Sequence, residues 1–135
     1  MHNRAMPGAT VIPELAYADV GQACDWLCAA FGFTLRWRAG GHRAQLNVGD
    51  GAVVVREGGP APRDAAHSLM VRVDDVQSHH NRAARHGAEI LRGPTDFPYG
   101  ERQYTAVDLG GHVWTFSQSI ADVDPASWGA TVGTL

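Results

Sequence analysis

An internal repeat limits the folds open to this chain more than any other feature of its sequence. Each copy starts with an alternating apolar segment, continues with a helical segment and ends with three short alternating segments. Alternation of apolar and polar side chains predicts strands, whereas apolar residues at every third or fourth position predict a helix. Both halves are therefore β-α-β-β-β. A unit this short cannot bury both faces of its sheet, so the two halves are expected to share one sheet.

In the first half, residues 10–18 alternate apolar and mixed side chains and predict a strand. Asp19 follows as the expected N-cap of a helix, because its carboxylate can accept a hydrogen bond from a free N–H of the first turn. Apolar residues at helical spacing continue until Gly32, a residue that suits a helix end. Three further strands are expected at about 33–38, 42–48 and 52–57.

The second half repeats this order. Alternation over residues 67–73 predicts a strand, and Asp75 is placed to open the second helix. Strands are then expected at about 89–92, 101–107 and 112–118. The expected organisation is one domain over residues 1–135, with module one at about 10–57, a linker at 58–66, module two at about 67–118 and a C-terminal tail at 119–135.

Composition excludes several classes of function. The chain has 135 residues and a net charge of −3, without a dense run of one sign, so binding to nucleic acid through its phosphates is not expected. All 11 basic residues are Arg, which excludes Schiff-base chemistry and a P-loop lysine. No segment is apolar over the length of a membrane span, and we expect a cytoplasmic protein with no membrane partner. Cys24 and Cys28 are expected to stay reduced.

The repeat and several short motifs resemble the vicinal oxygen chelate superfamily, which includes glyoxalase I, extradiol dioxygenases and bleomycin-resistance proteins. The matching motifs are Ala18-Asp19-Val20, Trp26-Leu27, Phe31-Gly32-Phe33, Val73-Asp74-Asp75-Val76, Gly87-Ala88-Glu89-Ile90, Asp108-Leu109-Gly110-Gly111-His112-Val113-Trp114 and Asp122-Val123-Asp124-Pro125. The resemblance implies an α+β fold in which two tandem βαβββ modules form a curved mixed sheet, a cup, with helices on its convex side. It also implies a homodimer.

The metal-dependent members of this superfamily hold a divalent ion with His, Glu or Gln from the first and last strand of each module. Counting from the landmarks of the repeat places the equivalent positions at Ile12, Val55, Ser68 and Thr115. None of these is a strong ligand. A shift by one residue offers Glu57 or His67, but strand side chains alternate between faces, so the shifted set points out of the cup. We therefore expect neither a metal nor another cofactor.

The sequence contains no recognisable catalytic motif. Gly-x-Ser-x-Gly, Gly-x-Gly-x-x-Gly and Cys-x-x-Cys are absent, so no catalytic residue is assigned. Among the seven histidines, His80 lies on the apolar stripe of the second helix and is expected to pack in the core, with His79 facing elsewhere. For His112, a hydrogen bond to nearby backbone is the favoured interpretation.

Side chains expected to face the cup suggest a site for a flat ligand. Glu14 and Arg72 are either paired with each other or available to a ligand, because buried charges are costly alone. Aromatic rings provide apolar walls, and Arg can stack on rings or bind acidic groups. The candidate ligand-binding residues are Glu14, Trp37, Ser68, Met70, Arg72, Phe97, Tyr99, Arg102, Tyr104 and Thr115.

The leading hypothesis is a metal-free protein that binds and sequesters an aromatic or peptide-like antibiotic or metabolite, as the bleomycin-resistance branch does. The alternative is a metal-dependent lyase, isomerase or dioxygenase of the glyoxalase superfamily. A purely structural or regulatory dimer is a third interpretation, without a distinctive residue behind it. The expected partners are a small-molecule ligand and a second copy of the chain. The identity of the ligand and the roles of Trp26 and Trp128 are left open.

Overall fold

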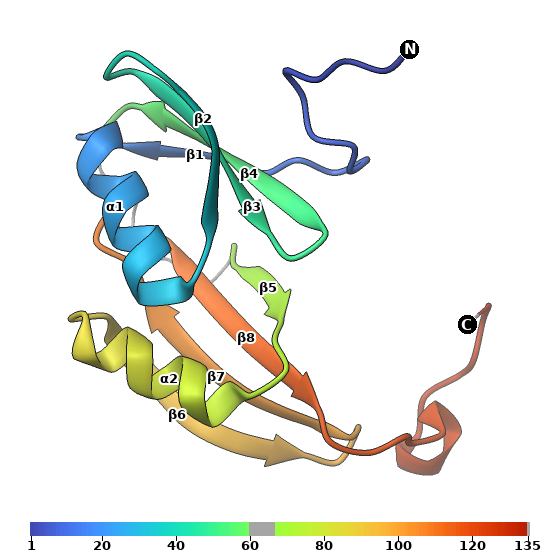
Figure 1. Ribbon diagram of the computed structural model, residues 1–135. Helices are drawn as coiled ribbons and strands as arrows, with labels where there is room; N and C mark the ends of the chain where they lie inside the picture. Colours follow the sequence, from blue (N-terminus) through green and yellow to red (C-terminus); the bar gives the residue numbers. More distant parts are fainter. Residues whose placement is uncertain (60–66, 135) are drawn as a thin grey trace.

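Two copies of the expected β-α-β-β-β unit follow one another along the chain in the structure, a computed structural model that describes residues 1–59 and 67–134 (Figure 1). Module one contains β1 (Glu14–Tyr17), α1 (Val20–Phe31), β2 (Thr34–Ala39), β3 (Arg43–Val48) and β4 (Gly51–Glu57). Module two contains β5 (Leu69–Arg72), α2 (Val76–Arg85), β6 (Glu89–Phe97), β7 (Glu101–Val107) and β8 (Val113–Ser119), and a short 3-10 helix, η1 (Pro125–Trp128), follows. The α+β class and the tandem arrangement are confirmed.

Both helices begin where the sequence predicts, and α1 also ends there. The Asp19 carboxylate accepts a hydrogen bond from the Gln22 N–H at the start of α1, and the Asp75 carboxylate accepts one from the Ser78 N–H at the start of α2. These side chains satisfy N–H groups that have no partner within the helix. Gly32 ends α1 with a φ of 78°, a left-handed conformation that other residues rarely adopt.

Each module forms a four-stranded sheet of its own. The strand orders are β1-β4-β3-β2 and β5-β8-β7-β6, and in each sheet the first pair is parallel while the others are antiparallel. Among the described residues, no strand of one sheet pairs with a strand of the other. The expectation that both halves share one sheet is therefore wrong for the described residues, and the modules share a hydrophobic core instead.

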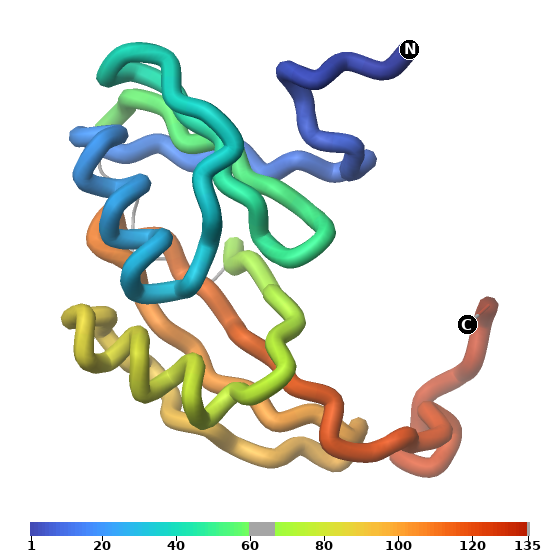
Figure 2. Tube along the Cα trace, viewed as in Figure 1, coloured from blue at the N-terminus to red at the C-terminus, as the bar shows by residue number. Residues whose placement is uncertain are grey.

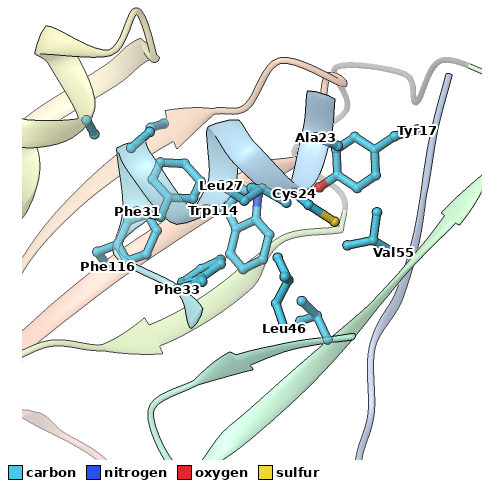
Figure 3. Close-up of a cluster of buried hydrophobic side chains, with 14 of the residues drawn as sticks. Tyr17, Ala23, Cys24, Leu27, Phe31, Phe33, Leu46, Val55, Trp114 and Phe116 are labelled. Carbon is cyan, nitrogen blue, oxygen red and sulfur yellow. The ribbon is translucent and has the colours of Figure 1, made fainter. Parts of the chain in front are cut away.

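That common core lies between the helices and the sheets, and aromatic rings from both modules meet in it (Figure 3). Phe31 of module one packs edge-on against Trp114 of module two, with ring centroids 5.6 Å apart, and Phe33 packs against the same ring in a tilted arrangement at 5.3 Å. Aromatic pairs of this geometry stabilise a core beyond the area that they bury. The interface between the modules is therefore part of the core.

The helices of the two modules are also joined by hydrogen bonds. The Arg82 guanidinium on α2 donates through Nε to the Ala29 carbonyl of α1 at 2.7 Å and through Nη2 to the Cys28 carbonyl at 3.3 Å. These carbonyls belong to the last turn of α1, where a cation is favoured by the helix dipole. Trp26 Nε1 donates to the His86 carbonyl at 2.8 Å. Trp26, whose role the sequence left open, thus links α1 to the end of α2 within one chain.

A buried carboxylate connects the turn between β7 and β8 to module one. Asp108 Oδ2 accepts hydrogen bonds from the Tyr17 hydroxyl at 2.6 Å and from Trp114 Nε1 at 3.0 Å. Asp108 Oδ1 accepts from the backbone N–H groups of Gly110 and His112. Burial, followed by the nearby Asp108 charge, raises the pKa of Tyr17 far above its usual range, so this phenol stays a donor.

Three features of the fold differ from the sequence prediction. β1 begins at Glu14 rather than at residue 10, although the Pro13 carbonyl still accepts from the Val54 N–H. β6 runs to Phe97, whereas the strand was expected to end at about residue 92; its pairing with β7 is irregular, which hides the alternation. η1 was not predicted. The expected linker at 58–66 lies mostly outside the described residues. No helix within the described part of the chain is long and apolar enough to cross a membrane.

Candidate functional site

The alternation of β5 and β8 decides which side chains of module two reach its concave face, the side of the sheet turned away from α2. Leu69 and Val71 pack against the core, so Met70 and Arg72 point to the opposite face. Register then places Met70 beside Thr115 of β8, which itself lies opposite Thr105 of β7. The predicted cup-facing residues Ser68, Met70, Arg72 and Thr115 therefore belong to one surface.

Hydrogen bonds between side chains run across this surface from β7 to β8. The hydroxyl oxygens of Thr105 and Thr115 are 3.0 Å apart, and Gln103 Nε2 donates to the Ser117 hydroxyl at 3.0 Å. The Ser117 hydroxyl in turn donates to Glu101 Oε1 at 2.7 Å. We call Glu101, Gln103, Thr105, Thr115 and Ser117 the polar ladder. Gln103, Thr115 and Ser117 are buried, whereas Glu101 and Thr105 are half-buried, so the ladder presents mainly a carboxylate and a hydroxyl, both held in fixed positions.

The acidic end of the polar ladder is stabilised in its charged form. A hydrogen bond from the Ser119 side chain contributes most to holding the pKa of Glu101 below its usual value. The Ser117 hydroxyl and the positive charge of Arg72 act in the same direction. At neutral pH this end of the face therefore presents a carboxylate next to a guanidinium.

Aromatic rings form the rim at the same end of the sheet. The rings of Phe97 and Tyr99 are stacked, with centroids 5.3 Å apart and planes 8° from parallel, and Trp128 of η1 lies 5.9 Å from the Tyr99 ring. The Arg92 guanidinium carbon lies 4.9 Å from the Phe97 ring centre, a cation–π contact. We call Phe97, Tyr99 and Trp128 the aromatic rim. Trp128, left open above, belongs to it.

Two hollows border these groups. One, of about 310 Å³, is lined by Ser68, Leu91, Arg92, Thr105, Val113 and Thr115. The other, of about 280 Å³, lies where the start of β1, the turn between β3 and β4, and β5 come together, and Met70 and Arg72 line it with Val11 and Pro13. Both mix apolar walls with a few polar groups, which is typical of small-molecule sites.

The concave face of module one carries the other predicted residues. Glu14 points to this face, but its partner is not Arg72: its carboxylate pairs with Arg56 at 2.8 Å and with Arg43 at 3.7 Å. The two arginines lie on the neighbouring strands of the same sheet, whereas Arg72 belongs to the other module. Trp37 also lies on this face, opposite Gln45 of β3.

The structure corrects the placement of Arg102 and Tyr104, which lie on the other side of the second sheet. Tyr104 is fully buried in the core opposite Phe116. Arg102 lies two residues earlier on the same face, where it forms two hydrogen bonds to Asp96, at 2.6 Å and 3.1 Å. Because side chains alternate along β7, neither residue can share a surface with the polar ladder.

The histidine assignment on α2 is corrected in part: His80 does pack edge-on against the buried Tyr104 ring, with centroids 5.3 Å apart, but His79 also makes core contacts, which were not expected of it. His79 lies between the modules: its Nε2 donates to the Phe31 carbonyl at 2.9 Å, and its Nδ1 accepts from the Tyr104 hydroxyl. Burial lowers the pKa of His79, so the ring is neutral. His112 Nε2 lies 2.8 Å from the Ala16 carbonyl, a backbone contact as predicted.

The residues at the expected metal-ligand positions do not fit a metal. Val55 is fully buried in the core beside α1 (Figure 3), and register puts Val54 on the concave face in its place. With Ile12, Ser68 and Thr115, the set still contains no imidazole or carboxylate. Within residues 1–59 and 67–134, no group of three or more His, Cys, Asp or Glu side chains could hold an ion.

Part of this surface was not predicted from the sequence. Alternation within residues 101–107 could have indicated Glu101, Gln103 and Thr105, because Tyr104 and Ala106 supply the apolar face of that strand. Arg92 and Leu91 could not have been found, since the irregular pairing of β6 breaks its alternation.

Two βαβββ modules around a common core, each with an open concave sheet, define the class of protein. Residues 10–116 match the family model of the glyoxalase/bleomycin resistance protein/dioxygenase superfamily, and the chain belongs to this superfamily. A comparison with curated proteins found no match.

Solved structures include several that are similar over most of the chain. TioX from Micromonospora sp. ML1 is 38% identical, with a TM-score of 0.71, over 83% of this chain and 99% of TioX. A glyoxalase/bleomycin resistance protein from Streptomyces sp. CB03234 is 25% identical, with a TM-score of 0.66, over 82% of this chain and all of the other. The fosfomycin resistance protein FosX from Listeria monocytogenes, 13% identical with a TM-score of 0.71, shares the fold alone.

Proposed function

We propose that this protein binds and sequesters an aromatic or peptide-like antibiotic or metabolite in the cytoplasm, without a metal and without turnover. The observation that carries this proposal is the concave face of module two, where the polar ladder runs beside an aromatic rim and an exposed arginine. A flat ring can pack against the exposed Tyr99 of the aromatic rim, and the hydroxyl groups of Thr105 and Thr115 line the hollow next to Arg92 where polar groups of the ligand can bind. Arg92 can bind an acidic or carbonyl oxygen of the same ligand.

A homodimer is part of the proposal. Each concave sheet is open in a single chain, and superfamily membership supports pairing of two chains so that a sheet of one faces a sheet of the other. The ligand would then be enclosed on two sides. Enclosure matters because ligand sites usually bury most of the surface of a bound small molecule.

The enzymatic alternative finds less support in the side chains. A lyase, isomerase or dioxygenase of this superfamily needs strong ligands for its ion. The corresponding positions are Ile12 before β1, Val54 in β4, Ser68 before β5 and Thr115 in β8, and none of them is a strong ligand. The carboxylate of Glu14 is nearby, but two arginines pair with it. The donor set therefore favours binding over metal-assisted chemistry.

Calorimetric titration with metal-free bleomycin, a peptide-like antibiotic with a planar aromatic end, tests the proposal. Arg92→Gln should weaken binding by about tenfold, because it removes a charge-assisted contact worth roughly 1.5 kcal/mol. Arg85→Gln, on the exposed side of α2, removes the same charge away from the site and should leave the affinity unchanged. Chromatography after incubation should recover intact bleomycin. No binding of bleomycin or of other flat aromatic antibiotics, or equal losses in both variants, would contradict the proposal.

A further inference from the structure

The concave face of module one is covered in part by the chain's own N-terminal segment, here residues 3–7. This segment lies on the side of the first sheet that is turned away from α1 (Figures 1 and 2). It is folded into a turn in which the Met6 N–H donates to the Asn3 carbonyl at 3.1 Å and the Ala5 N–H donates to Asn3 Oδ1 at 3.0 Å. The backbone carbonyls of the turn are thereby left for other partners.

Two adjacent side chains of β2 bind three consecutive carbonyls of this segment. Trp37 Nε1 donates to the Ala5 carbonyl at 3.0 Å, and Arg36 Nη2 donates to the carbonyls of Arg4 at 3.3 Å and Met6 at 3.5 Å. In a regular strand, neighbouring side chains point to opposite faces. The pairing of β2 with β3 shifts register between Leu35 and Trp37, and this bulge lets both donors act on one surface.

A third donor on the same surface has only a weak partner. Gln45 of β3 is 1% exposed; its Oε1 accepts from Arg36, and its Nε2 donates to the Met6 thioether sulfur at 3.6 Å. A thioether is a poor acceptor, and a buried amide N–H gains more from a carbonyl oxygen. The surface therefore presents three N–H donor groups toward the chain that covers it, one of them poorly satisfied.

We propose that Arg36, Trp37 and Gln45 form a subsite for the backbone of a carbonyl-rich, peptide-like ligand, and that residues 3–7 occupy this subsite when no ligand is bound. The inference rests on the proposed function and narrows its ligand class. The three donors suit amide or ester carbonyls equally, so peptides and depsipeptides share the required chemistry. The N–H groups of Ala5 and Met6 bond within the segment itself, so the bound backbone needs to offer acceptors only.

Occupation by a tethered segment has a measurable consequence. A ligand must displace residues 3–7, so its apparent affinity is lowered by the fraction of molecules in which the subsite is open. A free peptide of the same sequence competes at the effective concentration of the tethered segment, roughly millimolar for a short flexible connection. Weakening the turn of the segment should make displacement easier.

The test uses the full chain labelled with nitrogen-15 and a peptide that copies residues 3–7, acetyl-Asn-Arg-Ala-Met-Pro-amide, followed by NMR. With peptide at roughly 1 to 20 mM, the amide resonances of residues 4–6 should move toward random-coil positions, while the Trp37 indole N–H stays hydrogen-bonded. In Asn3→Ala, which removes the side-chain bond of the turn, half-displacement should need roughly two- to tenfold less peptide. The matched control Asn81→Ala, on α2, should behave like the parent protein.

Trp37→Phe gives a second, independent readout without peptide. It removes one donor, so the amides of residues 4–6 should move toward random-coil positions in the free protein. The inference is overturned if these resonances respond neither to the peptide nor to Trp37→Phe, or if Asn3→Ala raises the peptide concentration required. Failure of the proposed function gives a different result. In that case the peptide still displaces residues 3–7, but neither bleomycin nor other flat aromatic antibiotics bind to the protein.

Discussion

At the scale of single residues, the Asp108 carboxylate explains why the Gly-Gly-His turn has its sequence. Asp108 accepts four hydrogen bonds, and the backbone must bend tightly for the N–H groups of Gly110 and His112 to reach the same oxygen. Gly111 adopts a φ of 90°, in the left-handed region that favours glycine. The motif that resembles the superfamily is therefore a structural clamp between β8 and β1.

Gly110 is expected to tolerate no side chain, because Tyr17 lies directly against its backbone. A Cβ added there would come within 2.5 Å of Tyr17 Cδ1. Since the Tyr17 ring is buried and bonded to Asp108, it cannot move aside cheaply. Gly110→Ala should lower the free energy of unfolding by about 1 to 3 kcal/mol, measured by urea denaturation. Gly41→Ala, where nothing lies within 4 Å, is the control and should change it by less than about 0.5 kcal/mol. Equal effects would disprove this role of Gly110.

Removing the Tyr17 hydroxyl tests the clamp from the other side. Tyr17→Phe leaves the buried carboxylate of Asp108 with one donor fewer, which should cost about 1 to 3 kcal/mol of unfolding free energy. Tyr99→Phe removes a hydroxyl from an exposed ring, 3.4 Å from Gln103, and should cost much less. A small loss in Tyr17→Phe would mean that Trp114 and the backbone satisfy Asp108 without the phenol.

At the scale of helices and strands, alternation predicted the faces of β1, β5 and β8 but not those of β4 and β7. In β5, the apolar Leu69 and Val71 alternate with Met70 and Arg72, so one face is marked. In β4, three valines in a row mark neither face, and Val55 was placed on the wrong side. In β7, both faces carry groups that could bind a ligand, and the aromatic ring of Tyr104 proved to be a core residue. Alternation is informative only where the two faces differ in polarity.

Packing of α2 against α1 depends on a neutral His79, and this makes stability depend on pH. Its pKa is lowered from 6.5 in the folded state, so the unfolded chain binds more protons near that value. Stability from this group is complete above about pH 6.5 and is lost as the pH falls toward the lower folded pKa. The urea midpoint should therefore fall between pH 8 and pH 5, and it should fall less in His79→Gln. An equal fall in both proteins would assign the pH dependence to other groups.

At the scale of the whole molecule, two exposed apolar side chains mark the edge where the modules meet. Val11 is 79% exposed and Met70 is 66% exposed, and both line the hollow beside β5. Apolar groups gathered around a hollow indicate an interaction surface. In the proposed homodimer, the second chain covers this edge and encloses the ligand between two concave sheets.

This arrangement predicts that a charge at Val11 weakens the dimer. Val11→Glu should raise the dimer dissociation constant at least about tenfold, because a carboxylate that loses water at an apolar contact is costly without a partner. Sedimentation equilibrium measures the constant, and Val132→Glu, at another exposed valine in the tail, should leave it unchanged. In Val11→Glu, the loss of the dimer should also lower the affinity for bleomycin, because two chains enclose each ligand. The affinity should return at a protein concentration high enough to restore the dimer. A monomeric parent protein would contradict the proposed dimer. Undiminished bleomycin binding by the Val11→Glu monomer would show that one concave face suffices.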